Sequence, residues 1–136
     1  MKMNPVVHFE MPAEDTKRMS DFYAKTFGWV LNQMGPEMGN YVTAMTSECD
    51  GTGVPKERGH INGGFFQKNA DNTAPSIVIA VDDIQKHMEK VADAGGIVIG
   101  EPVEIPGVGQ YVSFTDTEGN RASMLQPAPR TAVPQE

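Results

Sequence analysis

The chain begins with alternating apolar and polar residues and then changes to a helical spacing. Residues 6–11 alternate between two prolines, Pro5 and Pro12, and this period of two is typical of a half-buried strand. From Glu14 to Thr26 and just beyond, the apolar side chains fall at helical spacing, and Gly28 follows them. Glycine is a common helix stop because it adopts the left-handed conformation without strain. The region therefore predicts a strand followed by a helix.

The same order returns in the second half of the chain. Residues 77–81 form a short aliphatic run that predicts a strand. Asp82 or Asp83 is placed to cap a helix that ends at Gly95-Gly96. An offset of 68 residues superimposes the two patterns, so that Asp15 falls on Asp83. The agreement indicates that one structural unit occurs twice.

Each half continues with further strand-like segments. The segments GNYV at 39–42 and GQYV at 109–112 correspond at an offset of 70, and the last segments, 61–67 and 121–126, correspond at an offset of 59. The smaller offset means that the first half carries about eleven extra residues before its last strand. They fall within residues 46–60, which are rich in glycine, proline and charge and predict a mobile loop.

We therefore predict two β-α-β-β-β modules within a single domain, residues 1–136. The first module spans residues 4–68 and the second spans 74–127, with a polar linker at 69–73 and a frayed tail at 128–136. The fold class is α+β. We expect the modules to pair into a curved, partly closed mixed β-barrel, with the helices outside and a concave face left for a ligand.

Composition narrows the function classes. The chain has 11 Lys+Arg against 18 Asp+Glu, a net charge of −7, and no basic stripe, which argues against nucleic acid as a partner. The longest aliphatic run, at 77–81, is far shorter than the ~20 residues of a membrane span. The single Cys49 rules out an intrachain disulfide, and the first residues lack the apolar stretch of a secretory signal. We expect a cytoplasmic protein with no membrane association.

Several segments, taken in order, resemble the vicinal oxygen chelate superfamily, which includes glyoxalase I, bleomycin-resistance proteins, fosfomycin-resistance proteins and extradiol dioxygenases. The segments are HFEMPAEDTKRMSDFYAKTFGW, Gly63-Gly64, VDDI with its helix and AGG, and EIPGVGQYVSFTDTEGNRASMLQP. The resemblance covers residues 4–127. It looks closest to small bacterial glyoxalase-like proteins related to lactoylglutathione lyase, and it implies the glyoxalase/bleomycin resistance protein/dihydroxybiphenyl dioxygenase fold.

The resemblance also implies a divalent metal on the concave face, held by the first and last strands of each module. The first-strand positions, seven residues before the acidic residue that opens each helix, are His8 and Ser76. The last-strand positions are Gly64 and Ser123. Serine hydroxyls are poor ligands for Zn²⁺, Ni²⁺ or Fe²⁺, and glycine offers no side chain. We therefore expect no metal at these positions and no cofactor.

Strand alternation selects the candidate catalytic residues. The apolar residues at odd positions in 7–11 should face the helix, which leaves His8 and Glu10 on the concave side. His8 could then act as a general base near neutral pH, with Glu10 tuning it. One alternative is a half-buried histidine that only hydrogen-bonds its neighbours. Another is a substitute site for a divalent metal, built from His8, Glu10 and His60, because two imidazoles and a carboxylate can hold Zn²⁺.

The same alternation predicts residues that would contact a small-molecule ligand. These candidates are Tyr41, Asn62, Tyr111, Arg121 and Ser123. Arg121 suits recognition of a carboxylate or phosphate, and it equally suits a solvated position after a turn. The two tyrosines, which the repeat relates, either line the cavity or pack within the sheet.

The predicted function is that of a glyoxalase-like small-molecule-binding protein with an incomplete set of metal ligands and no assigned reaction. The alternative is a metal-dependent enzyme that uses displaced ligands, namely a lyase or isomerase related to lactoylglutathione lyase, or a dioxygenase. A third hypothesis is an accessory module that uses the fold for protein contact. A homodimer is expected by analogy with the superfamily.

Overall fold

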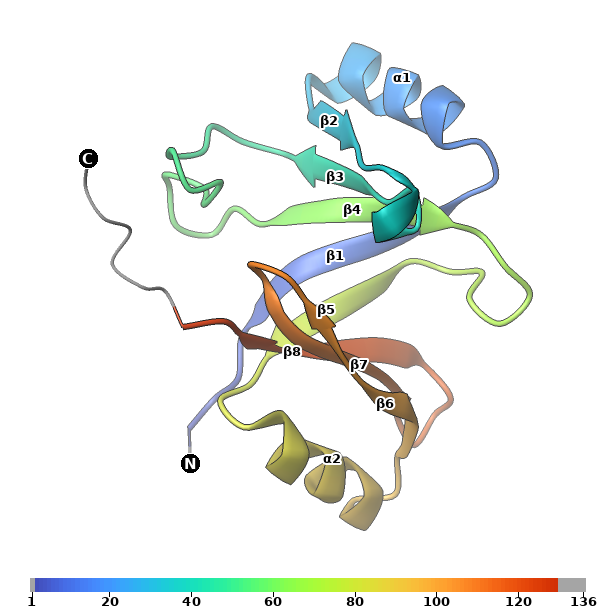
Figure 1. The fold of residues 1–136 in the computed structure, drawn as a ribbon, viewed down its shortest axis with the longest axis vertical. Helices are drawn as coiled ribbons and strands as arrows, with labels where there is room; N and C mark the ends of the chain where they lie inside the picture. Colours follow the sequence, from blue (N-terminus) through green and yellow to red (C-terminus); the bar gives the residue numbers. More distant parts are fainter. Residues whose placement is uncertain (1, 130–136) are drawn as a thin grey trace. The chain divides into compact units, whose positions relative to one another are not determined.

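A computed structural model of the chain describes residues 2–129, so most of the expected tail at 128–136 lies outside the described residues. The first half contains β1 (Val6–Ala13), α1 (Thr16–Phe27), β2 (Val30–Gln33), the short 3-10 helix η1 (Pro36–Met38), β3 (Val42–Met45) and β4 (Asn62–Gln67). The second half contains β5 (Ser76–Ala80), α2 (Ile84–Asp93), β6 (Ile97–Ile105), β7 (Gly109–Thr115) and β8 (Arg121–Pro127). The predicted order of a strand, a helix and three strands is confirmed in both halves (Figure 1).

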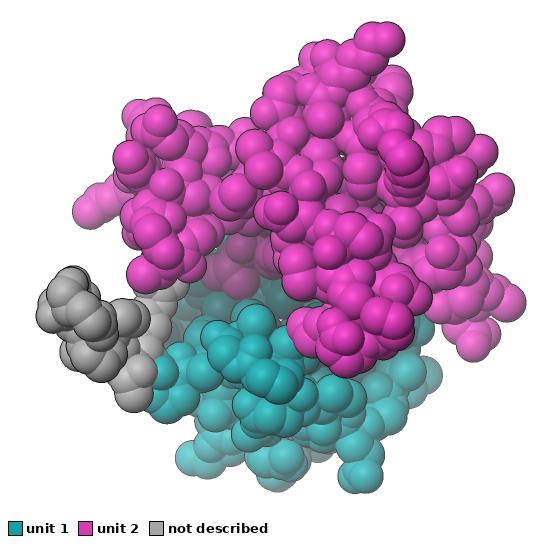
Figure 2. All heavy atoms as spheres, turned by 45° about the horizontal axis from the view of Figure 1, so that its top comes forward, with its two compact units in different colours: residues 1–6, 78–136 teal, residues 7–77 magenta. Residues whose placement is uncertain are grey.

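The chain divides into two compact units (Figure 2). Val7–Ile77 forms one unit and contains nearly all of the predicted first module. The other unit contains Val78–Glu136 together with Met1–Val6. The amino-terminal segment joins the second module because its backbone pairs there: Ala80 N–H donates to the Pro5 carbonyl. The first residues of the predicted first module, up to Val6, therefore belong structurally to the second.

The first module is a four-stranded mixed sheet in the order β2-β3-β4-β1. The pairs β2–β3 and β3–β4 are antiparallel, whereas β1 runs parallel to β4. The α1 helix begins where the Asp15 side chain accepts from the Arg18 N–H and ends at Gly28, which has a φ of 73°. The helix covers one face of the sheet, over a core that includes Val42 and Phe65.

The second module repeats this arrangement with the order β5-β8-β7-β6, in which β5 and β8 are parallel. Asp83, not Asp82, caps α2 by accepting from the Lys86 N–H. The core beneath α2 includes Val112 and Met124. The β6 strand is longer than the sequence pattern suggests because a shift in register between Ile99 and Val103 lets it continue past Gly100.

Trp29, which follows the first helix, anchors that helix to its sheet. Its ring stacks on Tyr23 of α1 at a centroid distance of 4.6 Å and also contacts Phe65 of β4 and Phe9 of β1. Aromatic pairs of this kind add to the stability that burial alone provides. Within residues 2–129, no helix has the length and apolar character needed to cross a membrane.

The insertion at 46–60 has local order of its own. The Asp50 carboxylate accepts from the backbone N–H groups of Thr52 and Val54, which closes a tight turn. Cys49 and Pro55 form an isolated antiparallel bridge on either side of that turn. The segment predicted as a loop is thus a short hairpin-like excursion between β3 and β4.

Candidate functional site

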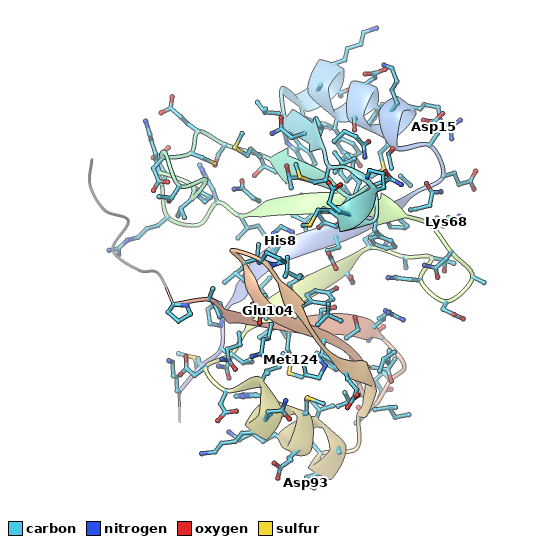
Figure 3. The ribbon with its side chains drawn as sticks, in the orientation of Figure 1. His8, Asp15, Lys68, Asp93, Glu104 and Met124 are labelled. Atoms are coloured by element: carbon cyan, nitrogen blue, oxygen red, sulfur yellow. The ribbon has the colours of Figure 1, made fainter. Side chains whose placement is uncertain are left out.

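The two faces of the first sheet have different chemistry. In the pairing of β1 with β4, His8 lies opposite Asn62 and Glu10 lies opposite Gly64. These residues share the face away from α1, because Met11 and Phe65 point to the other side and pack in the core with the helix. The predicted alternation is therefore confirmed, and His8 lies in the first half of β1 (Figure 3).

Tyr41 brings the two candidate catalytic residues together. Its hydroxyl donates to Glu10 Oε2 at 3.0 Å and lies 3.1 Å from Nε2 of His8. All three side chains are half-buried. Tyr41 immediately precedes β3, whose residue Thr43 pairs with Gly64, so the phenol reaches back across the sheet to β1. We call His8, Tyr41 and Glu10 the polar triad.

Burial controls the charge of His8. Removal of the imidazole from water lowers the pKa of His8 below its ordinary value of 6.5, and the nearby Glu10 carboxylate partly opposes this by favouring the charged ring. The burial effect is the larger of the two, so His8 is neutral at pH 7. A neutral imidazole has one nitrogen that can accept a proton or a hydrogen bond.

The Asn62 side chain, predicted to contact a ligand, is engaged by the 46–60 insertion. Its Nδ2 donates to the Gly53 carbonyl at 2.9 Å, and its Oδ1 accepts from the Thr46 N–H at 3.2 Å. Cys49 Sγ lies 3.8 Å from the same oxygen. Asn62 thereby ties the insertion to the start of β4, next to His8 in the sheet register.

The second module carries a buried hydroxyl network on the corresponding face. Ser123 Oγ donates to the Tyr111 hydroxyl at 2.7 Å and lies 3.0 Å from Ser113 Oγ. Ser123 is only 2% exposed. Because a serine hydroxyl has a single hydrogen, Ser113 must donate to Ser123. Arg121 begins β8 opposite Thr115 and, by alternation, lies on the same face.

Two other residues that the sequence offers as metal ligands, Ser76 and His60, do not join the polar triad. Ser76 helps to line a hollow of about 410 Å³ with the aromatic rings of Phe9 and Trp29. His60 is exposed and lies in the insertion, two residues before β4. Across residues 2–129, no three His, Cys, Asp or Glu side chains gather into a group that could hold a metal. The substitute site from His8, Glu10 and His60 thus remains a prediction without support from the geometry.

Two hollows on the first module are lined by residues other than the polar triad. One, of about 450 Å³, lies at the start of α1 between Phe22 and Lys68, and the other is the hollow beside Ser76. The case for the polar triad as the candidate site rests on its side chains and their hydrogen bonds.

Two features of the site were not predicted from the sequence. One is the Tyr41 hydroxyl, which bridges His8 and Glu10, and the other is Ser113, which joins the Ser123 network. The repeat carries part of the signal: the offsets of 70 and 59 relate Tyr41 to Tyr111 and Gly64 to Ser123, so the same two positions recur in both modules. The offsets do not give the reach of a side chain across the sheet.

Residues 6–124 match the model of the Glyoxalase/Bleomycin resistance protein/Dioxygenase superfamily. A glyoxylase-like domain-containing protein from Didymella fabae is 30% identical over 116 residues, which cover 82% of this chain and 84% of that protein. A putative glyoxylase, CFP32, from Mycobacterium tuberculosis is 44% identical over 54 residues, 40% of this chain. This match spans only 21% of the mycobacterial protein.

A solved structure of similar fold is Streptomyces coelicolor methylmalonyl-CoA epimerase in complex with 2-nitronate-propionyl-CoA. It has a TM-score of 0.67 and 14% sequence identity, over 94% of this chain and 97% of the epimerase. At this identity the likeness concerns the fold alone, and it extends over both modules.

Proposed function

The chain belongs to the Glyoxalase/Bleomycin resistance protein/Dioxygenase superfamily, and from this premise we propose that it binds a small organic molecule at the polar triad, without a divalent metal. It is a glyoxalase-like protein whose specific activity is unassigned. The observation that carries the proposal is the Tyr41 hydroxyl, which lies within hydrogen-bonding distance of both His8 and Glu10.

The donors at the expected metal positions do not suit the divalent metals that superfamily members often use. His8 supplies one imidazole, Gly64 supplies nothing, and Ser76 lines an apolar hollow. The Ser123 hydroxyl is buried and already donates to Tyr111. Zn²⁺ and related ions select imidazole, thiolate or carboxylate ligands, and a neutral hydroxyl is a weak substitute. The role that we propose for the polar triad therefore does not involve a metal ion.

The polar triad offers a ligand acid–base chemistry instead. His8 is neutral at pH 7 because its burial disfavours the charged ring. If it takes a proton from a bound molecule, the resulting imidazolium is stabilised by the Glu10 carboxylate, which is linked to it through Tyr41. A molecule with an O–H, an N–H or an acidic C–H directed at the imidazole would match this arrangement. His8 and Glu10 are therefore the proposed catalytic pair.

The proposal extends to the other candidate ligand contacts. We assign Tyr41 to the site directly and Asn62 to holding the adjoining insertion. Tyr111, Ser123 and Arg121 are proposed as a second set of polar contacts, supported by their common face in the second module. A homodimer and a cytoplasmic location complete the proposal. The dimer is supported by the frequency of dimers in the superfamily.

The test is a screen of small organic molecules by NMR on uniformly labelled protein. We expect binders to perturb the backbone signals of β1 and β4 around His8 and Gly64, and we expect His8→Gln to weaken binding about tenfold or more, because it removes the proton acceptor. His60→Gln is the matched control, since His60 is exposed, and it should leave binding unchanged. Binders that perturb only other surfaces, or that tolerate His8→Gln, would refute the proposal.

The competing function is a metal-dependent lyase, isomerase or dioxygenase that uses displaced ligands. It requires His60 to approach His8 and Glu10, so it makes the opposite prediction for the same control. Under this alternative, His60→Gln would abolish the uptake of metal and with it any activity. The two variants together therefore separate the two functions.

A further inference from the structure

The space beside Gly64 is filled by Tyr41. A Cβ atom built on Gly64 would lie 1.9 Å from the tyrosine oxygen and 2.1 Å from its Cζ, far closer than any real contact. Gly64 has no positive φ that would require glycine for the backbone alone. The phenol is therefore the reason that position 64 has no side chain.

The second module shows the same relation in a milder form. Ser123 occupies the position that corresponds to Gly64 at the offset of 59, and Tyr111 corresponds to Tyr41 at the offset of 70. There the last-strand residue keeps a short side chain, whose hydroxyl donates to the tyrosine at 2.7 Å. In both modules the phenol of the third strand meets the last-strand position that the superfamily resemblance assigns to a metal ligand.

The hydrogen bond from Tyr41 to Glu10 determines which atom is the donor in the contact between Tyr41 and His8. The single phenolic hydrogen goes to Glu10 Oε2. The contact between the Tyr41 oxygen and His8 Nε2 then needs its hydrogen from the imidazole. A neutral ring with its hydrogen on Nε2 has its acceptor lone pair on Nδ1.

We propose that Tyr41 is a positioning residue that takes the place of the missing last-strand metal ligand in the first module and holds His8 with its hydrogen on Nε2. Nδ1 is then the atom that receives a proton or a hydrogen bond from a bound molecule. The inference deepens the proposed function and relies on it only for the role of Nδ1. The occupancy of the Gly64 space and the position of the imidazole hydrogen are both measurable without a ligand.

The position of the hydrogen is tested by NMR of protein with ¹⁵N-labelled histidine at neutral pH. We expect the His8 ring to carry its hydrogen on Nε2, and we expect Tyr41→Phe to speed the exchange of that hydrogen with water about fivefold, because its acceptor is lost. Tyr23→Phe is the matched control, since that phenol contacts Met11 on the helix face. A wild-type hydrogen on Nδ1, or an exchange rate that Tyr41→Phe leaves unchanged, would overturn the proposal.

The occupancy of the Gly64 space is tested by a double-mutant cycle followed by thermal unfolding. Gly64→Ala should lower the melting temperature by roughly 5–10 °C, because its methyl group overlaps the phenol. In a Tyr41→Ala background the same substitution should cost about half as much or less.

Gly63→Ala provides the control for this cycle. A Cβ at Gly63 would meet the Phe9 ring at 2.3 Å, on the other face of the strand, so Tyr41→Ala should not relieve it. Equal costs of Gly64→Ala with and without the Tyr41 ring would overturn the proposal. The outcome does not depend on ligand binding, so a failure here is distinct from a failure of the proposed function.

Discussion

The two modules share one frame and differ in the residues on its polar face. Glu10 pairs with Gly64 in the first module, and at the equivalent register Val78 pairs with Ser123 in the second. Likewise Thr43 pairs with Gly64 and Ser113 pairs with Ser123. The repeat thus preserves the strand register, while an ionisable carboxylate in one module becomes a buried valine in the other.

This difference indicates that the first module is the one suited to acid–base chemistry. In the first module the tyrosine contacts a histidine and a glutamate, and all three are half-buried. In the second module the equivalent tyrosine accepts a hydrogen bond from the neutral hydroxyl of Ser123, which is almost fully buried and also contacts Ser113. The Glu10 carboxylate is tolerated in the first module because it is half-buried and has a hydrogen-bond donor in Tyr41, whereas an ion without water or a partner is costly.

The largest expected effects come from truncating core residues on the helix-facing side, where the two modules should lose similar amounts of stability. Phe65 and Met124 are equivalent at the offset of 59 and are 0% and 2% exposed. Phe65→Ala should lower the free energy of unfolding by about 3–5 kcal/mol and Met124→Ala by about 2–5 kcal/mol, through lost burial and a cavity. Urea unfolding measures both values, and a cost below about 1 kcal/mol at either site would contradict the assigned cores.

Exchanging the last-strand residues should give a smaller effect that differs between modules. Gly64→Ser puts a side chain into the space of the Tyr41 ring and should cost about 1–3 kcal/mol. Ser123→Gly removes a hydroxyl and adds chain entropy, with a cost of about 1–2 kcal/mol. Calorimetry gives both values. If Gly64→Ser left the free energy of unfolding unchanged or raised it, the Tyr41 ring would be shown to move aside without cost.

Removing the hydroxyl of each tyrosine should lower the free energy of unfolding by different amounts in the two modules. Tyr111→Phe leaves the buried Ser123 hydroxyl without its acceptor and should cost about 1–3 kcal/mol. Tyr41→Phe affects half-buried groups that water can reach and should cost about 0.5–1.5 kcal/mol. Chemical denaturation of the two variants compares them directly, and a reversed order would argue against the assigned burial.

The smallest expected effect is on the pH dependence of stability. Because burial lowers the pKa of His8 in the folded protein, the unfolded chain binds its proton first, and stability falls as the pH drops below about 6.5. Two titratable groups of the first module act on His8: the Tyr41 hydroxyl lies 3.1 Å from its Nε2, and the Glu10 carboxylate acts through its charge. His8→Gln should reduce this loss, whereas Ser76→Ala at the equivalent position should not. Denaturation midpoints between pH 5 and 7 would decide, and an unchanged slope in His8→Gln would contradict the assigned shift.

The sequence predicts most of the fold because the repeat constrains it. Asp15 and Gly28 mark the ends of the first helix, and the structure places its cap and its stop at those residues. The faces of β1 follow from simple alternation, which separates His8 from Met11. Such local rules depend on backbone periodicity and are visible in any window of the chain.

The candidate site is harder to predict because it depends on side-chain reach. Asn62 has the expected position but uses its amide to hold the insertion at Gly53. Tyr41 precedes β3 and still contacts two residues of β1, across the intervening β4. Strand alternation predicts neither the contact of Asn62 nor that of Tyr41, because each depends on the rotamer that the side chain adopts. The fold is therefore predictable from pattern, whereas the polar triad needs coordinates.

The central claim, that the polar triad works without the metal of related proteins, is tested most directly by elemental analysis of freshly purified protein. The analysis is repeated after dialysis against Ni²⁺, Zn²⁺, Mn²⁺ and Fe²⁺, and the melting temperature is recorded each time. The account predicts no stoichiometric ion and no shift in melting temperature. About one tightly held ion per chain, with a raised melting temperature that His8→Gln abolishes, would contradict it.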